Sequence, residues 1–115
     1  IVIVDFHAEA TSEKKTMGYY LDGVATAVLG THTHVQTADE QILPNGTAYI
    51  SDSGMTGPHD SIIGVKKELM MNWLVNKKYS KFEPGEDNVK LEGVLFSADV
   101  VSGKAMKIER IQKNI

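Results

Sequence analysis

The sequence predicts an α/β fold for this chain of 115 residues, and three observations support the prediction. Two short apolar runs near the start enclose a segment with helical spacing of its apolar residues, which indicates the order strand, helix, strand. Clusters of glycine, proline and asparagine separate the later runs. The last third alternates apolar and polar residues, as antiparallel strands do. With 42% hydrophobic residues, the chain suits one domain around one core.

The first thirty residues are expected to form a parallel strand–helix–strand unit. Residues 1–6 are apolar except for Asp5, the pattern of a strand buried on both faces. A hydroxyl residue at position 11 or 12 can cap a helix that ends near Gly23. The apolar run over 25–29 then supplies a second strand, parallel to the first through a right-handed crossover. The inner face of the helix is expected to carry Met17, Tyr20, Leu21 and Val24.

The rest of the chain is expected to form two hairpins around one helix. Proline, asparagine and glycine mark the turn of a hairpin over 42–50, and residues 53–61 have the composition of an irregular surface loop. Helical spacing predicts a helix over 65–76. The segments 89–96 and 104–111 are expected to pair as an antiparallel hairpin. The apolar stripe of the helix, expected in the core, consists of Leu69, Met70, Trp73 and Leu74.

Composition excludes several classes of partner and ligand. The net charge is -3 and the twelve basic residues form no run, so no nucleic-acid polymer is indicated as a partner. No cysteine is present, which excludes thiolate metal sites and fits a cytoplasmic location. No apolar stretch reaches the length of a membrane span. The chain opens inside a β-branched run without an initiator methionine, so we expect it to be part of something longer.

Three of the four histidines follow the two predicted parallel strands. His7 ends the first strand, and His32 and His34 follow the second, so all three are expected at the sheet edge where open α/β sheets keep their ligands. Imidazole is a common metal ligand, which predicts a metal site. Spacing alone does not distinguish a dinuclear site from a mononuclear zinc site or from plain loop histidines. Asp5 is a candidate partner that would orient an imidazole, and His59 is expected to be exposed.

Four segments carry a close resemblance to a known family. They are DFHAEATSEK at 5–14, GTHTHVQTAD at 30–39, ILPNGTAYI at 42–50 and DSGMTGP at 52–58. Together they resemble the bacterial calcineurin-like metallophosphoesterases of the YmdB type. The resemblance covers nearly the whole chain and weakens after Asn76.

The resemblance implies a fold and a reaction. The fold is a two-sheet metallophosphoesterase sandwich flanked by helices, of which residues 1–115 supply the C-terminal part and the N-terminal half is absent. His7 and His32 would bind one metal of a dinuclear site and His34 the other. The two ions, divalent or trivalent, would be iron or manganese. Family members resemble phosphodiesterases in which a metal-bridging hydroxide attacks the phosphorus of a cyclic nucleotide or another small phosphodiester.

The remaining metal ligands and the general acid of such enzymes belong to the N-terminal half, so this chain supplies no catalytic residue of its own and is expected to be inactive alone. Gly54, Thr56 and Gly57 are candidates for a loop beside the substrate phosphate. A sheet edge left open by the absent half would expose backbone donors and apolar surface, so association between copies is expected. The alternative function is a regulatory or binding module that a metal stabilises and that hydrolyses nothing.

Overall fold

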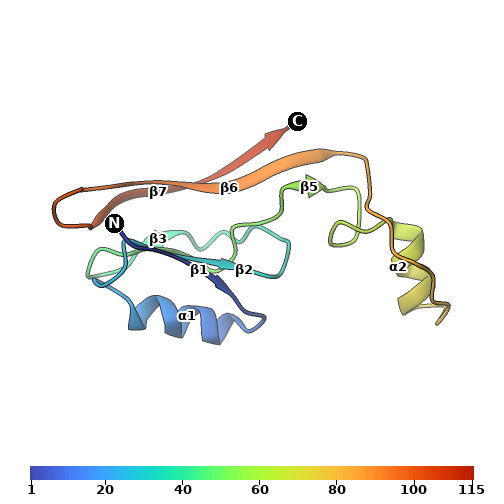
Figure 1. The fold of residues 1–115 in the computed structure, drawn as a ribbon, viewed down its shortest axis with the longest axis horizontal. Coiled ribbons are helices and arrows are strands. Elements are labelled where there is room, and N and C mark those ends of the chain that lie inside the picture. The colour runs from blue at the N-terminus through green and yellow to red at the C-terminus, as the bar shows by residue number, and fades with distance from the viewer.

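The computed structural model describes all residues from 1 to 115 and contains two sheets and two helices (Figure 1). The strands are β1 (Ile3–His7), β2 (Ala27–Thr31), β3 (Gln41–Ile42), β4 (Ala48–Ile50), β5 (Gly57–Pro58), β6 (Val89–Ala98) and β7 (Ala105–Asn114). The helices are α1 (Thr11–Tyr20) and α2 (Lys67–Leu74). The predicted mixed α/β architecture is confirmed.

The first sheet has the strand order β1-β2-β4-β3. β1 and β2 pair in parallel, and β2 and β4 also pair in parallel, whereas β3 runs antiparallel to β4. The predicted strand–helix–strand crossover and the predicted hairpin over 42–50 are therefore confirmed. The second sheet has the order β5-β6-β7, and its long β6–β7 hairpin is the one expected at the end of the chain.

The first sheet lies between α1 on one face and the β6–β7 hairpin on the other, so the core has two sides (Figure 1). Alternate residues of β2 point to opposite sides, as the pleat of a strand requires. Val28 belongs to the cluster under α1, whereas its neighbour Ala27 belongs to the cluster under the hairpin. Around these two residues pack Val4, Phe6, Met17, Leu21, Leu43 and Tyr49 on the α1 side, and Leu29, Ala48, Phe96, Ala105 and Ile108 on the hairpin side.

The prediction that the first strand is buried on both faces is wrong. β1 is an edge strand, and its side chains alternate between exposed and half-buried, with Ile3 55% exposed. The inner face expected for α1 is also only partly correct. Met17 and Leu21 pack against the core, but Tyr20, at the last position of the helix, and Val24, beyond its end, are exposed.

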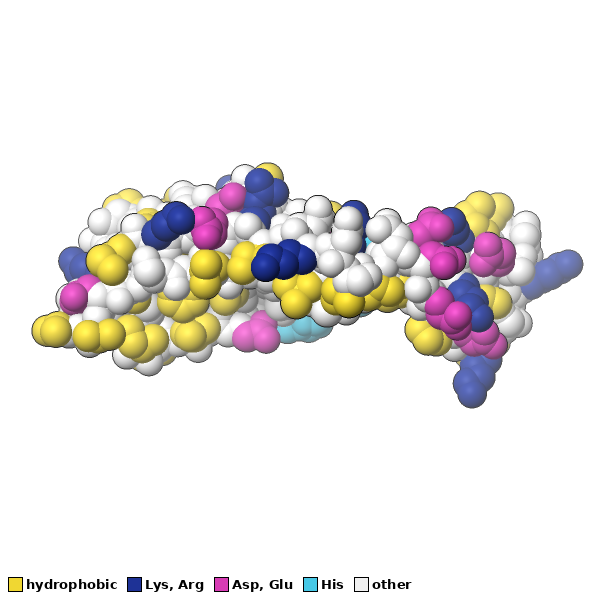
Figure 2. Space-filling model, turned by 90° about the horizontal axis from the view of Figure 1, so that it is seen from above, with side chains coloured by type: hydrophobic (Ala, Val, Ile, Leu, Met, Phe, Trp, Pro, Cys, Tyr) yellow, Lys and Arg dark blue, Asp and Glu magenta, His cyan; other side chains and the backbone are white.

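α2 lies at one end of the long axis, apart from the two layers of the core (Figure 1). Figure 2 shows this end joined to the rest of the molecule through a narrow waist. The prediction that its apolar stripe lies in the core is wrong, since only Met70 is buried, while Trp73 is 42% and Leu74 50% exposed. Trp73 instead stacks edge-on against Phe82, with 5.2 Å between ring centroids. Helical spacing shows which face of a helix is apolar, but not what covers that face.

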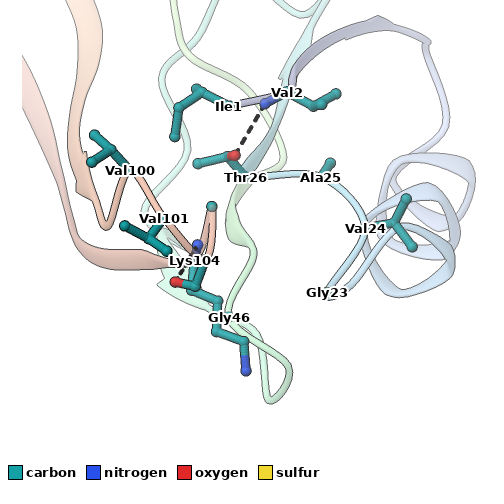
Figure 3. A pocket seen from close by; sticks show the side chains of 12 residues that line it. Ile1, Val2, Gly23, Val24, Ala25, Thr26, Gly46, Val100, Val101 and Lys104 are labelled. Carbon is teal, nitrogen blue, oxygen red and sulfur yellow. Dashed lines mark hydrogen bonds between the residues drawn. The ribbon is translucent and has the colours of Figure 1, made fainter.

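One depression of about 210 Å³ lies at the amino ends of the parallel strands (Figure 3). Val2 and Thr26 line it, and the backbone N–H of Val2 donates to the Thr26 hydroxyl at 3.1 Å. The valines at the tip of the β6–β7 hairpin line its other side. It contains no histidine or carboxylate and lies a strand length from His7, so it is separate from the predicted site. No helix of the structure has the length and apolarity needed to cross a membrane.

Candidate functional site

The parallel register of β1 and β2 brings the two predicted histidine positions together. His7 is the last residue of β1 and pairs with Thr31, the last residue of β2, so His32 follows directly beside it. His32 Nδ1 lies 3.1 Å from His7 Nε2, and the two rings meet edge-on with centroids 4.9 Å apart. Two nitrogens that bind one metal ion at adjacent positions lie roughly 3.0–3.4 Å apart. The observed separation therefore fits two ligands of a common ion.

Backbone strain marks the same loop. His32 has a φ of 121° and His34 a φ of 63°, both in the left-handed region that side-chain-bearing residues rarely adopt. Such conformations cost about 1–3 kcal/mol each and gather at functional sites, where the surrounding structure enforces them. Glycine would adopt these φ values without strain, yet both positions carry a histidine. The two imidazoles are therefore held in place at an energetic cost to the backbone.

The three histidines share one open depression of about 190 Å³ with Gly54 and Met55. Figure 2 shows histidine atoms at the surface near the middle of the long axis, beside acidic side chains. The sequence therefore predicted which histidines gather. Of the three expected loop residues, Gly54 lines this depression, whereas Thr56 and Gly57 do not. Met55 was missed, and a lone methionine in an irregular loop gives no signal that could have found it.

Asp5 reaches His7 through a hydroxyl group rather than directly. Thr31 Oγ1 donates to Asp5 Oδ1 at 2.9 Å, and the same hydroxyl lies 3.2 Å from His7 Nδ1. Because a hydroxyl that donates to a carboxylate can still accept, His7 can donate from Nδ1 and leave Nε2 free as a lone-pair ligand. This chain of contacts supports the orienting role predicted for Asp5, with Thr31 as its intermediary.

A buried ion pair beneath the loop was not predicted. Lys14 of α1 and Asp52 after β4 lie 3.0 Å apart, with side chains 2% and 1% exposed. Asp52 also accepts the backbone N–H of Thr33 at 2.8 Å and that of Gly54 at 3.0 Å. One carboxylate thus ties the residue between His32 and His34 to the opposite wall of the depression. In the sequence Lys14 stands among charged residues at the start of the helix, where a lysine is expected to be exposed. The sequence therefore carried no sign of its burial.

Two opposing effects set the pKa of Asp52. Burial disfavours the charged carboxylate and raises the pKa, but the hydrogen bonds from Thr33, Gly54 and Lys14 stabilise the charge more strongly. The net effect lowers the pKa of Asp52 below its ordinary value of 3.8. The carboxylate therefore stays ionised and keeps both oxygens available as acceptors near neutral pH.

The segment after the histidines is fastened to both sheets by polar side chains. Gln36 Nε2 lies 3.1 Å from the Ser53 carbonyl, 2.9 Å from that of Gly93 in β6 and 3.3 Å from that of Ile111 in β7. The Gln36 amide thus reaches the neighbouring loop and both strands of the hairpin. We call residues 32–39 the histidine loop, and Gln36 couples this loop to the second sheet.

Asp39 closes the histidine loop at its other end. Its Oδ1 accepts the Thr37 hydroxyl at 2.8 Å, the Ser51 hydroxyl at 2.9 Å and the Ser51 backbone N–H at 3.1 Å. Burial raises the pKa of Asp39, but these hydrogen bonds outweigh burial and lower the pKa below its ordinary value. The loop thus returns to the end of β4 through a charged acceptor.

The loop around Gly54 is more ordered than predicted. Residues 53–61 are not irregular throughout, because β5 pairs with β6, and Glu92 of β6 accepts the Met55 N–H at 3.0 Å. The Gly54 N–H donates to Asp52. Since carboxylates engage both N–H groups, neither is free for a phosphate, and contact of this loop with substrate stays a prediction. His59 is not exposed as expected: its Nε2 lies 3.1 Å from the Met55 carbonyl and its side chain is 18% exposed.

No group of three or more potential metal-ligating side chains comes together within the chain. The two convergent nitrogens of His7 and His32 are therefore an incomplete ligand set, and a bound ion would take further ligands from outside these residues. The imidazoles lie at the carboxyl ends of parallel strands, the edge where open α/β sheets generally keep their ligands.

Comparison with known proteins identifies the family. A family model described as YmdB-like protein matches residues 1–111, and the chain belongs to this family. The resemblance predicted from the sequence is thereby confirmed. A relative from Bacillus subtilis (strain 168), named 2',3'-cyclic-nucleotide 2'-phosphodiesterase, is 52% identical over 113 residues, which cover 98% of this chain and 43% of the relative.

Two solved structures share the fold. One is a hypothetical protein from Thermus thermophilus, with a TM-score of 0.92 and 39% identity over 98% of this chain and 44% of that one. The other is described as a novel phosphatase from Mycoplasma pneumoniae, with a TM-score of 0.91 and 43% identity over 96% of this chain and 40% of that one. The chain thus spans less than half the length of the relatives it matches.

Proposed function

We propose that this chain forms the C-terminal part of a metal-dependent phosphodiesterase that hydrolyses cyclic nucleotides. The observation that carries the proposal is the convergence of His7 Nε2 and His32 Nδ1 at 3.1 Å on a strained loop. The relative from B. subtilis is named for hydrolysis of 2',3'-cyclic nucleotides, which supports this substrate class. The sandwich expected from the resemblance would be completed by residues outside this chain, since the relatives are more than twice as long.

In this proposal His7 and His32 hold one ion and His34 holds a second, with iron or manganese as the expected metals. When bound, two cations supply positive charge to the phosphate and lower the pKa of water. The Thr31 hydroxyl, which donates to Asp5, accepts from His7 Nδ1 in the tautomer that leaves Nε2 free to bind metal. Asp52 holds the histidine loop in place by accepting the Thr33 backbone N–H. The general acid comes from outside the chain, so the chain alone is inactive.

The test uses the natural full-length protein. We expect two metal ions per molecule by elemental analysis, turnover of a 2',3'-cyclic nucleotide, loss of turnover on chelation and recovery on addition of Mn²⁺. The substitution His32→Ala should remove one ion and lower kcat by at least about 100-fold, as loss of a group that holds the reacting centre does. His59→Gln is the matched control, because His59 lies outside the depression and glutamine keeps an N–H donor for the Met55 carbonyl.

Turnover that survives chelation, or that survives His32→Ala, would contradict the proposal. One tightly held ion without turnover of any phosphodiester would instead favour the alternative, a regulatory or binding module that the ion stabilises.

A further inference from the structure

The depression around the three histidines has a second wall, which Gly54 and Met55 form. They are its only lining residues from outside the two parallel strands and the histidine loop. Both lie between β4 and β5, in a segment without helix or strand. Such a segment opens at low cost unless contacts from elsewhere hold it. Glu92 of β6 lies directly behind this wall and supplies such contacts.

We propose that Glu92 is a positioning residue, which holds the wall of Gly54 and Met55 in the conformation that the reaction requires. The inference rests on the proposed phosphodiesterase function and extends it to a residue of the second sheet. Glu92 does not line the depression, so it acts through the two wall residues.

The Glu92 carboxylate is buried and has a donor on each oxygen. Its side chain is 5% exposed. Oε2 accepts the backbone N–H of Met55 at 3.0 Å, and Oε1 accepts the side-chain amide of Gln112, its partner across the hairpin, at 2.6 Å. His59 Nε2 lies 3.9 Å from Oε2, beyond hydrogen-bond distance. Because a buried carboxylate that loses a donor is costly, the Met55 N–H is held firmly.

Gly54 packs directly against Glu92. Its φ is 91°, a conformation that glycine adopts without strain. A Cβ at this position would collide with the Glu92 carboxylate and would lie 2.9 Å from the Cβ of Gln36 in the histidine loop. The Thr56 hydroxyl also donates to the Glu92 carbonyl at 3.3 Å. Three successive residues, 54–56, therefore contact this one glutamate.

The hold of Glu92 on the wall is internal to the chain. It does not depend on which outer surfaces the rest of the full-length protein covers. A phosphate at His32 and His34 would lie beside this wall, because the wall and the histidines line one depression. Misplacement of an active-site group by about 1 Å can cost on the order of 100-fold in rate. Loss of the Glu92 acceptor should therefore slow turnover although it removes no metal ligand.

The test replaces the carboxylate in the natural full-length protein by an apolar side chain. Glu92→Leu leaves the Met55 N–H without its acceptor. With Mn²⁺ and adenosine 2',3'-cyclic phosphate, kcat should fall by at least about 10-fold, whereas metal content by elemental analysis should stay at the wild-type value. Glu92→Gln should keep kcat within about 3-fold of wild type, because its side-chain oxygen still accepts from Met55 and Gln112 can turn its amide.

Phe96→Leu is the matched control for a loss of stability alone. Phe96 lies on the same face of β6, four residues beyond Glu92, but it packs in the core under the hairpin. The melting temperature by circular dichroism should fall in Phe96→Leu as it does in Glu92→Leu. Well below the melting range, kcat should stay at the wild-type value in Phe96→Leu and fall only in Glu92→Leu.

The outcomes separate this inference from the function on which it rests. Wild-type protein that does not hydrolyse the nucleotide contradicts the phosphodiesterase proposal, and the role of Glu92 with it. If the wild-type protein is active, the role of Glu92 alone is overturned when Glu92→Leu keeps its kcat, when it loses bound metal, or when Phe96→Leu loses as much activity. A Glu92→Gln variant as slow as Glu92→Leu also overturns it, because charge rather than the hold on Met55 would then control the rate.

Discussion

The histidine loop and the α2 end of the molecule are both poor in regular structure, yet they are held in different ways. We call residues 60–87 the α2 arm. The histidine loop is connected to the first sheet through Asp52, which lies beneath it, and through its own Asp39. Gln36 of the loop connects it to the hairpin. Within the α2 arm only Met70 is buried. The surface ion pair Lys66–Glu83, at 2.8 Å, is typical of what holds the arm together.

The two regions differ in the kind of contact that holds them. Buried charge with complete hydrogen bonding is costly to form and costly to disrupt, so it holds a strained loop in one conformation. Exposed ion pairs contribute little to stability, so the α2 arm is expected to open locally at low cost. The strained histidines lie in the first region, and the second carries no predicted site residue.

The largest effect is expected when the buried ion pair is broken. Lys14→Met leaves the Asp52 carboxylate buried without its cation, which should lower the free energy of unfolding by about 3–5 kcal/mol in urea titrations. Lys66→Met, the matched change in the α2 arm, should leave the urea midpoint unchanged because that lysine is in solvent. Equal shifts in the two variants would show that the two regions do not differ as described.

Next in size is a change at the closest backbone approach under the histidine loop. A Cβ on Gly30 would collide with the Ser51 carbonyl, so Gly30→Ala should destabilise the protein by about 1–3 kcal/mol in the same titration. Gly93→Ala in β6 is the control, since a Cβ there meets no atom within 4 Å and should change stability by less than about 0.5 kcal/mol. A tolerated Gly30→Ala would mean that β2 and the end of β4 can separate freely.

Acid should cost the histidine loop more stability than the α2 arm, whose ion pair Lys66–Glu83 is exposed. Asp39 and Asp52 have lowered pKa values in the folded state, so their stabilisation is complete above the ordinary value of 3.8 and is lost as pH falls below it. We expect the free energy of unfolding to fall by on the order of 1 kcal/mol between pH 5 and pH 3, measured by urea titration at each pH. Asp39→Asn should flatten this dependence. A slope that is unchanged in the variant would contradict the role given to Asp39.

The smallest effect is expected in the α2 arm. Trp73→Ala removes the edge-on contact with Phe82, worth about 0.5–1.5 kcal/mol, and should speed hydrogen exchange in α2. Amides of β2 and β4 serve as the internal control and should exchange at unchanged rates, because the arm opens without the core. Faster exchange in both regions would show that the arm and the sheet unfold together.

Much of the fold could be predicted from local patterns. Apolar runs located the parallel strands, turn residues located both hairpins, and helical spacing located α1 and α2 to within a few residues. Burial was predicted less well. Val4 and Phe6 of β1 face the core, whereas Ile3 faces outward. The apolar run did not predict this alternation, which follows from the position of β1 at the edge of the sheet. The exposure of Trp73 likewise depends on what packs nearby.

The sequence by itself determined that His7, His32 and His34 would lie at one edge of the sheet, where they line one depression, because parallel strands end at the same edge and the three residues end or follow such strands. Only the tertiary structure decided how they are held. Lys14 and Asp52 are 38 residues apart in the chain, and Gln36 reaches carbonyls 57 and 75 residues away. Strand ends can be predicted from periodicity, which is a local property. A buried ion pair depends on two distant segments folding against each other, and no local pattern records that.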